Sequence, residues 1–311
     1  MSEPTVAPKP VKPSILVMLD PDPQPSLFDA VVGIDAGVDH LLRYGGVTVS
    51  QVRDLVHGAI FTRGPADLKR TAIFVGGSDV DAAERLMEAV HAAFFSDFRV
   101  STMLDPNGAN TTAAAAIRAG LKSLGRDHAQ VGPQPLEGIR TAVLGGTGPV
   151  GRRVARLAAR LGAQVALGSR DLLRAQQAIH GITQAAGLPT DRFTPFDRVE
   201  VLSEFAPALV VACGAAGVTL LGTAERDALV SSLHVIIDLN AVPPAGVEGV
   251  AVTAKDQPLT PSDPSSPRVW GALGVGGLKM KLHRRVVQML FETSQSTFDA
   301  ETILDVARTM D

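Results

Sequence analysis

The sequence predicts an α/β protein with two open parallel α/β domains, one of the Rossmann type, and an active-site cleft between them. Apolar segments of strand length alternate with helical segments along almost the whole chain. A glycine-rich turn joins an apolar segment directly to a helix within residues 143–157. A polar stretch broken by Gly and Pro, Gly125–Gly138, divides the 311 residues near their middle and predicts a domain boundary.

The first half of the chain contains three expected strands, which are runs of mostly apolar residues at Ser14–Asp20, Thr71–Gly77 and Arg99–Asp105. Helical segments are expected at residues 26–37, 52–58, 80–90 and 111–124. Polar residues that precede helices are the expected caps, and they are Thr48 (in a capping box with Gln51), Ser78 and Asn110.

The second half repeats the alternation. Strands are expected at Thr141–Gly145, Gln164–Gly168, Leu209–Cys213 and Val235–Asp238. Helices are expected at Val150–Leu161, Asp171–Ala186, Thr223–Val230, Leu278–Phe291 and Asp299–Met310. The stretch Ala254–Arg268 is rich in Pro and Ser and predicts a loop or linker.

These elements define the expected domains. Residues 1–13 contain four prolines and predict a disordered tail. Residues 14–125 form the catalytic domain, which the last helices, 277–311, are expected to complete. Residues 126–276 form the Rossmann domain.

Composition excludes several classes of function. The net charge of −3 does not favour nucleic acid, which usually requires a basic surface. The longest apolar run, Ala208–Gly222, is shorter than a membrane helix. The N-terminus lacks the apolar core of a signal peptide, and the single cysteine suits a reducing compartment, so we expect a cytoplasmic protein. The scattered histidines predict no metal site.

The glycine turn has the pattern G-x-G-x-x-G, and its six positions are Gly146, Thr147, Gly148, Pro149, Val150 and Gly151. Glycines allow the backbone to approach a pyrophosphate, and the following helix offers free N–H groups to it. The same turn also occurs without a ligand, but the strand before it and the amphipathic helix after it favour dinucleotide binding.

The next strand end predicts which dinucleotide binds. NAD-specific sites place a carboxylate about 20 residues beyond the glycines. This chain has Ser169 and Arg170 there, with Arg174 one turn later, while Asp171 is expected to start the helix. A hydroxyl and arginines suit a 2′-phosphate, so we expect NADP, with NAD also accepted because no negative charge is expected at the site. The alternative is that Arg170 is a solvated loop residue that does not contact the phosphate.

Other strand ends supply further candidates. Cys213 is either a small buried filler beside the cofactor or a contact to it, and Gly214 lets the backbone pass close to the dinucleotide. Asn240 follows a strand and is either a nicotinamide contact or a turn residue.

The first domain has polar strand ends at Asp20 and Asp105, expected to face the same cleft, and polar residues that begin a helix at Asn110, Thr111 and Thr112. Asp29 is an acid within an apolar stretch, and it is either a functional acid or a first-turn helix residue. Lys279 and His283 share a helix face, and a lysine near a helix start opposes the helix dipole, which hints at a function.

Six segments together resemble a known family, the bacterial NAD(P)-dependent methylene-tetrahydromethanopterin dehydrogenases, some of which also accept methylene-tetrahydrofolate. The segments are SLFDAVVGIDAGVDH, TAIFVGG, MLDPNGANTTAAAA, VLGGTGPVG, DLNAVPP and GALGVGGLKMKLHR. The resemblance implies a homo-oligomer, a tetrahydropterin substrate, Asp29 and Lys279 in the active site, and Asn110 and Thr112 on the pterin side. It departs at Ser169, where close family members have Gly before the arginine.

The implied chemistry is hydride transfer from a methylene bridge between two nitrogens, which leaves a methenyl cation. No proton must move, so the protein has to position the donor carbon and stabilise positive charge. Asp29 is expected to face that charge, and Lys279 to orient the pterin or pair with Asp29. Two alternatives stay open at this point: a methylene-tetrahydrofolate dehydrogenase that also hydrolyses the methenyl product, and a non-catalytic NADP sensor.

Overall fold

The computed structural model describes residues 11–127 and 132–310, which form two compact units. The first unit comprises Met1–Pro106 and Arg284–Thr297, and the second comprises Asn107–His283 and Phe298–Asp311. Most of the tail expected at 1–13, and residues 128–131 of the expected boundary, lie outside the described residues.

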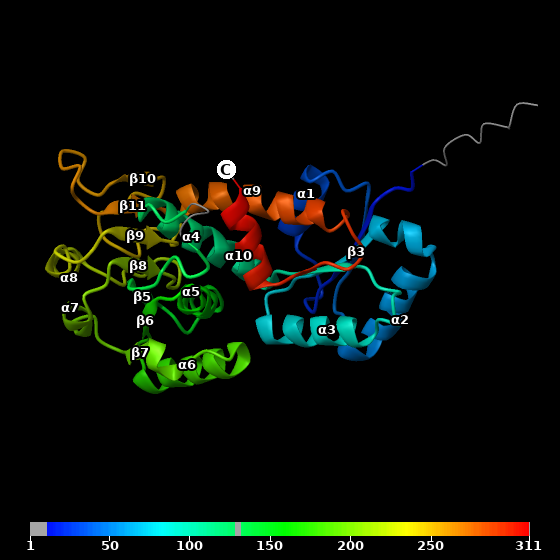
Figure 1. Cartoon of the computed structure of the whole chain (residues 1–311), viewed down its shortest axis with the longest axis horizontal. Helices are drawn as coiled ribbons and strands as arrows, with labels where there is room; N and C mark the ends of the chain where they lie inside the picture. The colour runs from blue at the N-terminus through cyan, green and yellow to red at the C-terminus, as the bar shows by residue number, and fades with distance from the viewer. Residues whose placement is uncertain (1–10, 128–131, 311) are drawn as a thin grey trace, which may run out of the picture. The chain divides into compact units, whose positions relative to one another are not determined.

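The first unit is built on four parallel strands in the order β4-β3-β1-β2, with the two-residue β12 beside β4. Figure 1 labels β3 of this sheet. The strands are β1 (Ile15–Leu19), β2 (His40–Tyr44), β3 (Thr71–Val75), β4 (Ser101–Leu104) and β12 (Thr297–Phe298). The expected strands β1, β3 and β4 are confirmed. The edge strand β2 was not expected, because most of its side chains are exposed and its sequence lacks a continuous apolar run.

Helices cover both faces of this sheet. They are α1 (Leu27–Asp35), α2 (Val49–Phe61) and α3 (Val80–Ala92), with a short 3₁₀ turn at Pro65–Arg70. Val17 and Leu19 face the core formed with α2 and α3, whereas Leu16 faces α1, as the alternation of a strand requires. The Thr48–Gln51 capping box is confirmed, but Asp79 caps α3 in place of Ser78.

The second unit contains a seven-stranded sheet in the order β10-β11-β9-β8-β5-β6-β7, in which only β10 is antiparallel among the described pairs. From β7 to β11 this is the Rossmann strand order. The strands are β5 (Arg140–Leu144), β6 (Gln164–Gly168), β7 (Phe193–Phe196), β8 (Leu209–Ala212), β9 (Val235–Asp238), β10 (Lys255–Pro258) and β11 (Arg268–Trp270). The stretch Ala254–Arg268, expected to be a loop, therefore contains β10 and the start of β11.

Helices also flank this sheet. They are α4 (Ala109–Ser123), α5 (Pro149–Arg160), α6 (Leu172–Ala186), α7 (Val201–Phe205), α8 (Thr223–Ala228) and α10 (Ala300–Thr309). The inner strands β5, β6, β8 and β9 are almost fully buried, as expected for a sheet covered on both faces. Trp270 is fully buried at the end of β11, and its indole N–H donates to Ser123 Oγ at 2.8 Å.

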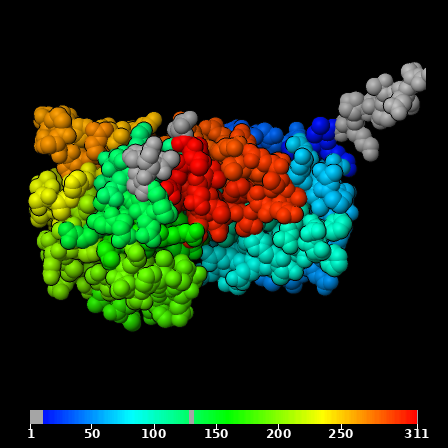
Figure 2. Space-filling model, viewed as in Figure 1, coloured from blue at the N-terminus to red at the C-terminus, as the bar shows by residue number. Residues whose placement is uncertain are grey.

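The division into units differs from the expected domains. Helix α4 belongs to the second unit because it packs against α5 and α10. Arg118 of α4 fixes the C-terminal helix by donating to the carbonyl oxygens of Ala307 and Met310. The last helices therefore do not all join the first unit, since α9 (Ala272–Met289) passes from the second unit into the first and α10 lies in the second. Figure 2 shows α10 (red) at the surface beside the green segments of its unit.

Candidate active site

The glycine turn lies between β5 and α5, and packing requires most of its glycines. Gly145 has a φ of +67°, and a Cβ on it would lie 3.0 Å from the backbone of Cys213. A Cβ on Gly146 would lie 2.6 Å from Leu167, and one on Gly151 would lie 2.6 Å from the Gly145 carbonyl oxygen. Gly148 differs, because the nearest atom to its Cβ, the Gly145 oxygen, is 3.6 Å away. The fold itself tolerates a side chain at 148, so its absence leaves room for a ligand at the α5 N-terminus.

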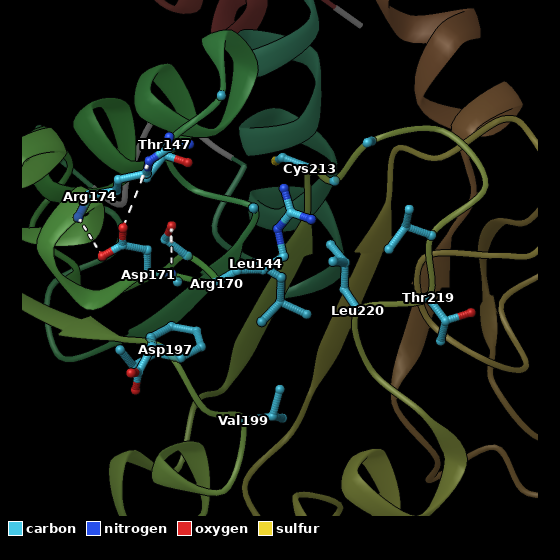
Figure 3. Close-up of a pocket in the computed structure, with 18 residues that line it drawn as sticks. Leu144, Thr147, Arg170, Asp171, Arg174, Asp197, Val199, Cys213, Thr219 and Leu220 are labelled. Carbon is cyan, nitrogen blue, oxygen red and sulfur yellow. Dashed lines mark hydrogen bonds and ion pairs between the residues drawn. The ribbon is translucent and has the colours of Figure 1, made fainter.

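A cavity of about 750 Å³ opens in front of this turn (Figure 3). Its size is that of a cofactor site. Seven of the residues expected to bind the cofactor line it: Thr147, Gly148, Ser169, Arg170, Arg174, Cys213 and Gly214. The other expected cofactor residues do not line it, namely Gly146, Pro149, Val150, Gly151 and Asn240. The structure therefore brings together residues that follow β5, β6 and β8.

The end of β6 carries the expected arginines and a carboxylate. Asp171 caps α6, as expected, by accepting from the backbone N–H groups of Leu173 at 2.9 Å and Arg174 at 3.4 Å. The Arg174 guanidinium lies 3.9 Å from the same carboxylate and is 73% exposed. Arg170 also lines the cavity, and in Figure 3 it lies nearer to Leu144 than Arg174 does.

The expectation that the site carries no negative charge is wrong. Asp171 and Asp197 both line the cavity. Asp197 escaped sequence analysis because it follows β7, a four-residue strand that contains Pro195 and was not predicted. Phe196 precedes it, and the ring of Phe196 fills the space where Gly168 has no side chain. Two phenylalanines, Phe193 and Phe196, separated by Thr194 and Pro195, gave only a weak local signal for the strand.

The strand ends of β8 and β9 differ in role. Cys213 is half-buried at the cavity, and burial together with the Asp238 charge raises the pKa of its thiol, which therefore stays protonated. A Cβ on Gly214 would lie 2.5 Å from Leu220. Asn240 folds its own loop, because its amide nitrogen donates to Pro244 O at 2.8 Å and its amide oxygen accepts from Val242 N at 3.0 Å. These bonds match the turn-residue interpretation of Asn240.

The carboxyl edge of the first unit holds two buried aspartates, Asp20 and Asp29. One carboxylate oxygen of each lies 3.7 Å from the position of a Cβ on Gly76, so both carboxylates lie beside this glycine. Asp20 accepts from the Ser26 backbone N–H at 3.2 Å, and the Ser26 hydroxyl accepts from the Asp29 backbone N–H at 3.2 Å. Asp20 therefore fixes the cap of the helix that carries Asp29. Burial raises the pKa of Asp20.

The loops around these aspartates hold one another. Asp22 accepts from the backbone N–H and hydroxyl of Ser78 at 2.8 and 3.0 Å, which ties the loop after β1 to the loop after β3. The backbone N–H of Gly46 donates to Asp22 O at 2.7 Å and ties in the loop after β2. Sequence analysis missed this network, since its partners are far apart in the chain.

The expected substrate residues are divided between the units. Asp105 is fully buried after β4 in the first unit. Asn110 and Thr112 lie in α4 of the second unit, and Thr112 is half-buried. Asn110 is not the helix cap, because α4 already begins at Ala109 with Gly108 in the cap position. Its amide oxygen accepts from the buried Arg153 of α5.

Lys279 lies well inside α9, because that helix begins at Ala272 and not at Leu278 as expected. The argument from a lysine at a helix start is therefore wrong. The Lys279 side chain is buried, and its Nζ lies 3.4 Å from His283 Nδ1. The same Nζ lies 3.4 Å from the position of a Cβ on Gly108, so Lys279 sits against the N-terminus of α4.

Residues 27–107 match the sequence family described as methylene-tetrahydromethanopterin dehydrogenase, N-terminal. Two proteins of Methylorubrum extorquens are similar to the chain. One, named bifunctional protein MdtA, is 42% identical and covers 95% of this chain and 98% of its own. The other, named NAD(P)-dependent methylenetetrahydromethanopterin dehydrogenase, is 33% identical and covers 91% of this chain and 93% of its own.

A solved structure resembles the chain in fold. Shikimate 5-dehydrogenase from Listeria monocytogenes, in complex with shikimate and NAD, gives a TM-score of 0.50 at 14% identity and covers 94% of this chain and 96% of its own. At this identity the likeness supports only the fold class, which is two α/β domains. Within residues 11–127 and 132–310, no helix has both the length and the apolar character needed to cross a bilayer.

Proposed function

The chain belongs to the methylene-tetrahydromethanopterin dehydrogenase family, and on that premise we propose that it transfers hydride from methylene-tetrahydromethanopterin to NAD(P) in one-carbon metabolism. The observation that carries the proposal is the extent of the match. Relatives 42% and 33% identical match 95% and 91% of this chain. Methylene-tetrahydrofolate is the second substrate to be considered.

The residues around the glycine turn fit a dinucleotide. Because Gly148 has no side chain, there is space for a diphosphate at the α5 N-terminus. Thr147 and Gly214 border the same cavity. Ser169, Arg170 and Arg174 would hold a 2′-phosphate, which supports a preference for NADP, while Asp171 and Asp197 limit that preference. When bound, the nicotinamide supplies a hydride acceptor.

The aspartates of the first unit fit the other half of the reaction. Hydride loss leaves a cation shared by two nitrogens, and a fixed carboxylate stabilises such a charge without moving a proton. Asp29 is the proposed carboxylate, with its backbone N–H held by Ser26. Asp105, Asn110 and Thr112 are proposed to bind the pterin. Lys279, whose ammonium group is positioned by His283, is proposed to orient it.

The proposal extends to assembly and location. Four large apolar side chains of α1, those of Leu27, Phe28, Val31 and Ile34, are at least half exposed. Such surface often lies in contacts between subunits, which supports a homo-oligomer. A cytoplasmic location accords with the single unpaired cysteine. Light scattering on the eluting protein measures the oligomer directly, and a monomer at assay concentrations would contradict this part.

A steady-state assay tests the activity. Methylene-tetrahydromethanopterin and methylene-tetrahydrofolate are each combined with NADP and NAD, and reduced nicotinamide is measured. We expect the highest kcat/KM with methylene-tetrahydromethanopterin and NADP. No reduction with any of the four pairs, in protein that binds NADP, would overturn the proposed activity. Hydrolysis of the methenyl product is followed separately, so that a second activity is not confused with hydride transfer.

A further inference from the structure

The cavity of the second unit has an end that neither the glycine turn nor the arginines account for. Phe196, Asp197 and Val199 follow β7 and line that end. In Figure 3, Asp197 and Val199 lie opposite Thr147 and Cys213. A ligand whose phosphates occupy the glycine turn must present another chemical group to these residues.

The sheet order identifies that group. From β5 the strands run outward through β6 to β7. In this arrangement the diphosphate lies at the first strand and the ribose at the second, so the base of the same nucleotide continues toward the third. The base therefore reaches the end of β7. Apolar side chains of Phe196, Val199 and Leu220 suit the faces of a planar ring there.

Asp197 is the residue that can form a hydrogen bond with a polar group on the edge of this ring. Its carboxylate lies 3.8 Å from the Arg198 guanidinium, but the two side chains are 39% and 80% exposed. An exposed pair of this kind holds its members weakly, so a ligand can replace it. Asp171, the other carboxylate at the cavity, is already committed to the N-terminus of α6.

We propose that Asp197 accepts a hydrogen bond from the exocyclic 6-amino group of adenine and thereby makes this site specific for adenine dinucleotides. An ionised carboxylate only accepts hydrogen bonds. Adenine offers a donor at position 6, whereas hypoxanthine offers a carbonyl oxygen, which the carboxylate repels. The inference depends on the proposed function only in that a dinucleotide binds at this cavity.

The test compares NADP with nicotinamide hypoxanthine dinucleotide phosphate, and NAD with its hypoxanthine analogue. Isothermal titration calorimetry gives Kd without the pterin, and the dehydrogenase assay gives kcat/KM. We expect the unmodified protein to bind the adenine form at least about tenfold more tightly. Asp197→Ala should remove most of this preference, and Asp197→Asn should remove or invert it, because an amide can donate to the 6-oxygen.

Arg198→Ala is the matched control, since it removes the neighbour of Asp197 without changing the lining of the cavity. It should keep the preference for adenine. Equal affinity for both bases in the unmodified protein, or an unchanged preference in Asp197→Ala, would overturn the inference. Either result leaves the proposed function intact if hydride transfer persists. Adenine preference without hydride transfer supports the inference and contradicts the proposed function instead.

Discussion

The two units use the same edge of a parallel sheet in opposite ways. In the first unit, the loops after β1, β2 and β3 bind one another through Asp20 and Asp22, and the edge is filled with buried carboxylates. In the second unit, the loops after β5, β6, β7 and β8 surround a cavity of about 750 Å³. The edge of the first unit is held by hydrogen bonds to aspartates, whereas the edge of the second is open where glycines such as Gly148 have no side chain. The comparison teaches that the first should govern chemistry and the second binding.

Asp29→Asn gives the largest expected effect. The amide keeps the size of the side chain but cannot offset the positive charge of the product, so kcat should fall by about 100- to 1000-fold. The Kd for NADP should stay unchanged, as stopped-flow binding can measure. Asp35→Asn, at an exposed position of the same helix, is the control and should turn over normally. A loss of NADP affinity in Asp29→Asn would contradict the expectation that the first unit governs chemistry and the second governs binding.

Gly148→Ala should act only on binding. A Cβ at 148 meets no atom of the protein closer than 3.6 Å, so the melting temperature should not change. The methyl group occupies the approach to the α5 N-terminus, and the Kd for NADP should rise about tenfold or more.

Gly151→Ala provides the contrast to Gly148→Ala. Its Cβ would lie 2.6 Å from the Gly145 oxygen, so overpacking should lower stability by about 1–3 kcal/mol. If Gly148→Ala and Gly151→Ala lose stability equally, the absence of a side chain at Gly148 is required for packing and not for a ligand.

Arg170→Ala sharpens the account of the second edge. Loss of one positive charge at a 2′-phosphate should raise KM for NADP about tenfold and leave KM for NAD nearly unchanged. Arg174→Ala should have a smaller effect, because Arg174 is 73% exposed and already lies beside Asp171. Equal losses with NADP and NAD would show that Arg170 does not recognise the phosphate.

The smallest effect concerns pH. Asp20 follows β1 in the first unit and Asp238 ends β9 in the second, and burial raises the pKa of both above the ordinary value of 3.8. A raised folded pKa means that the stabilising contribution is complete below the unfolded value and declines as pH rises through the folded value. Asp238→Asn should therefore flatten the decline in unfolding free energy above pH 3.8. Urea unfolding followed by circular dichroism measures both slopes, and identical slopes would contradict the expectation.

Local patterns predicted much of the molecule, because strands such as β5 and helices such as α5 are specified by their own residues. The edge strands β2 and β7 were missed, since one is mostly exposed and the other is short and contains Pro195. The glycine turn was predictable for the same local reason. Asp197 at the cavity and the hydrogen bonds between Asp22 and Ser78 were not, because sheet order and loop contacts bring together residues that are far apart in the chain.

The placement of two aromatic residues separates the units spectroscopically. Trp270 is the only tryptophan and is buried in the second unit, while Tyr44, the only tyrosine, lies in the first. Fluorescence excited at the red edge of absorption therefore follows the melting of the second unit alone. Tyrosine emission follows the other half, so one unmodified sample reveals whether the two halves lose structure together or in sequence.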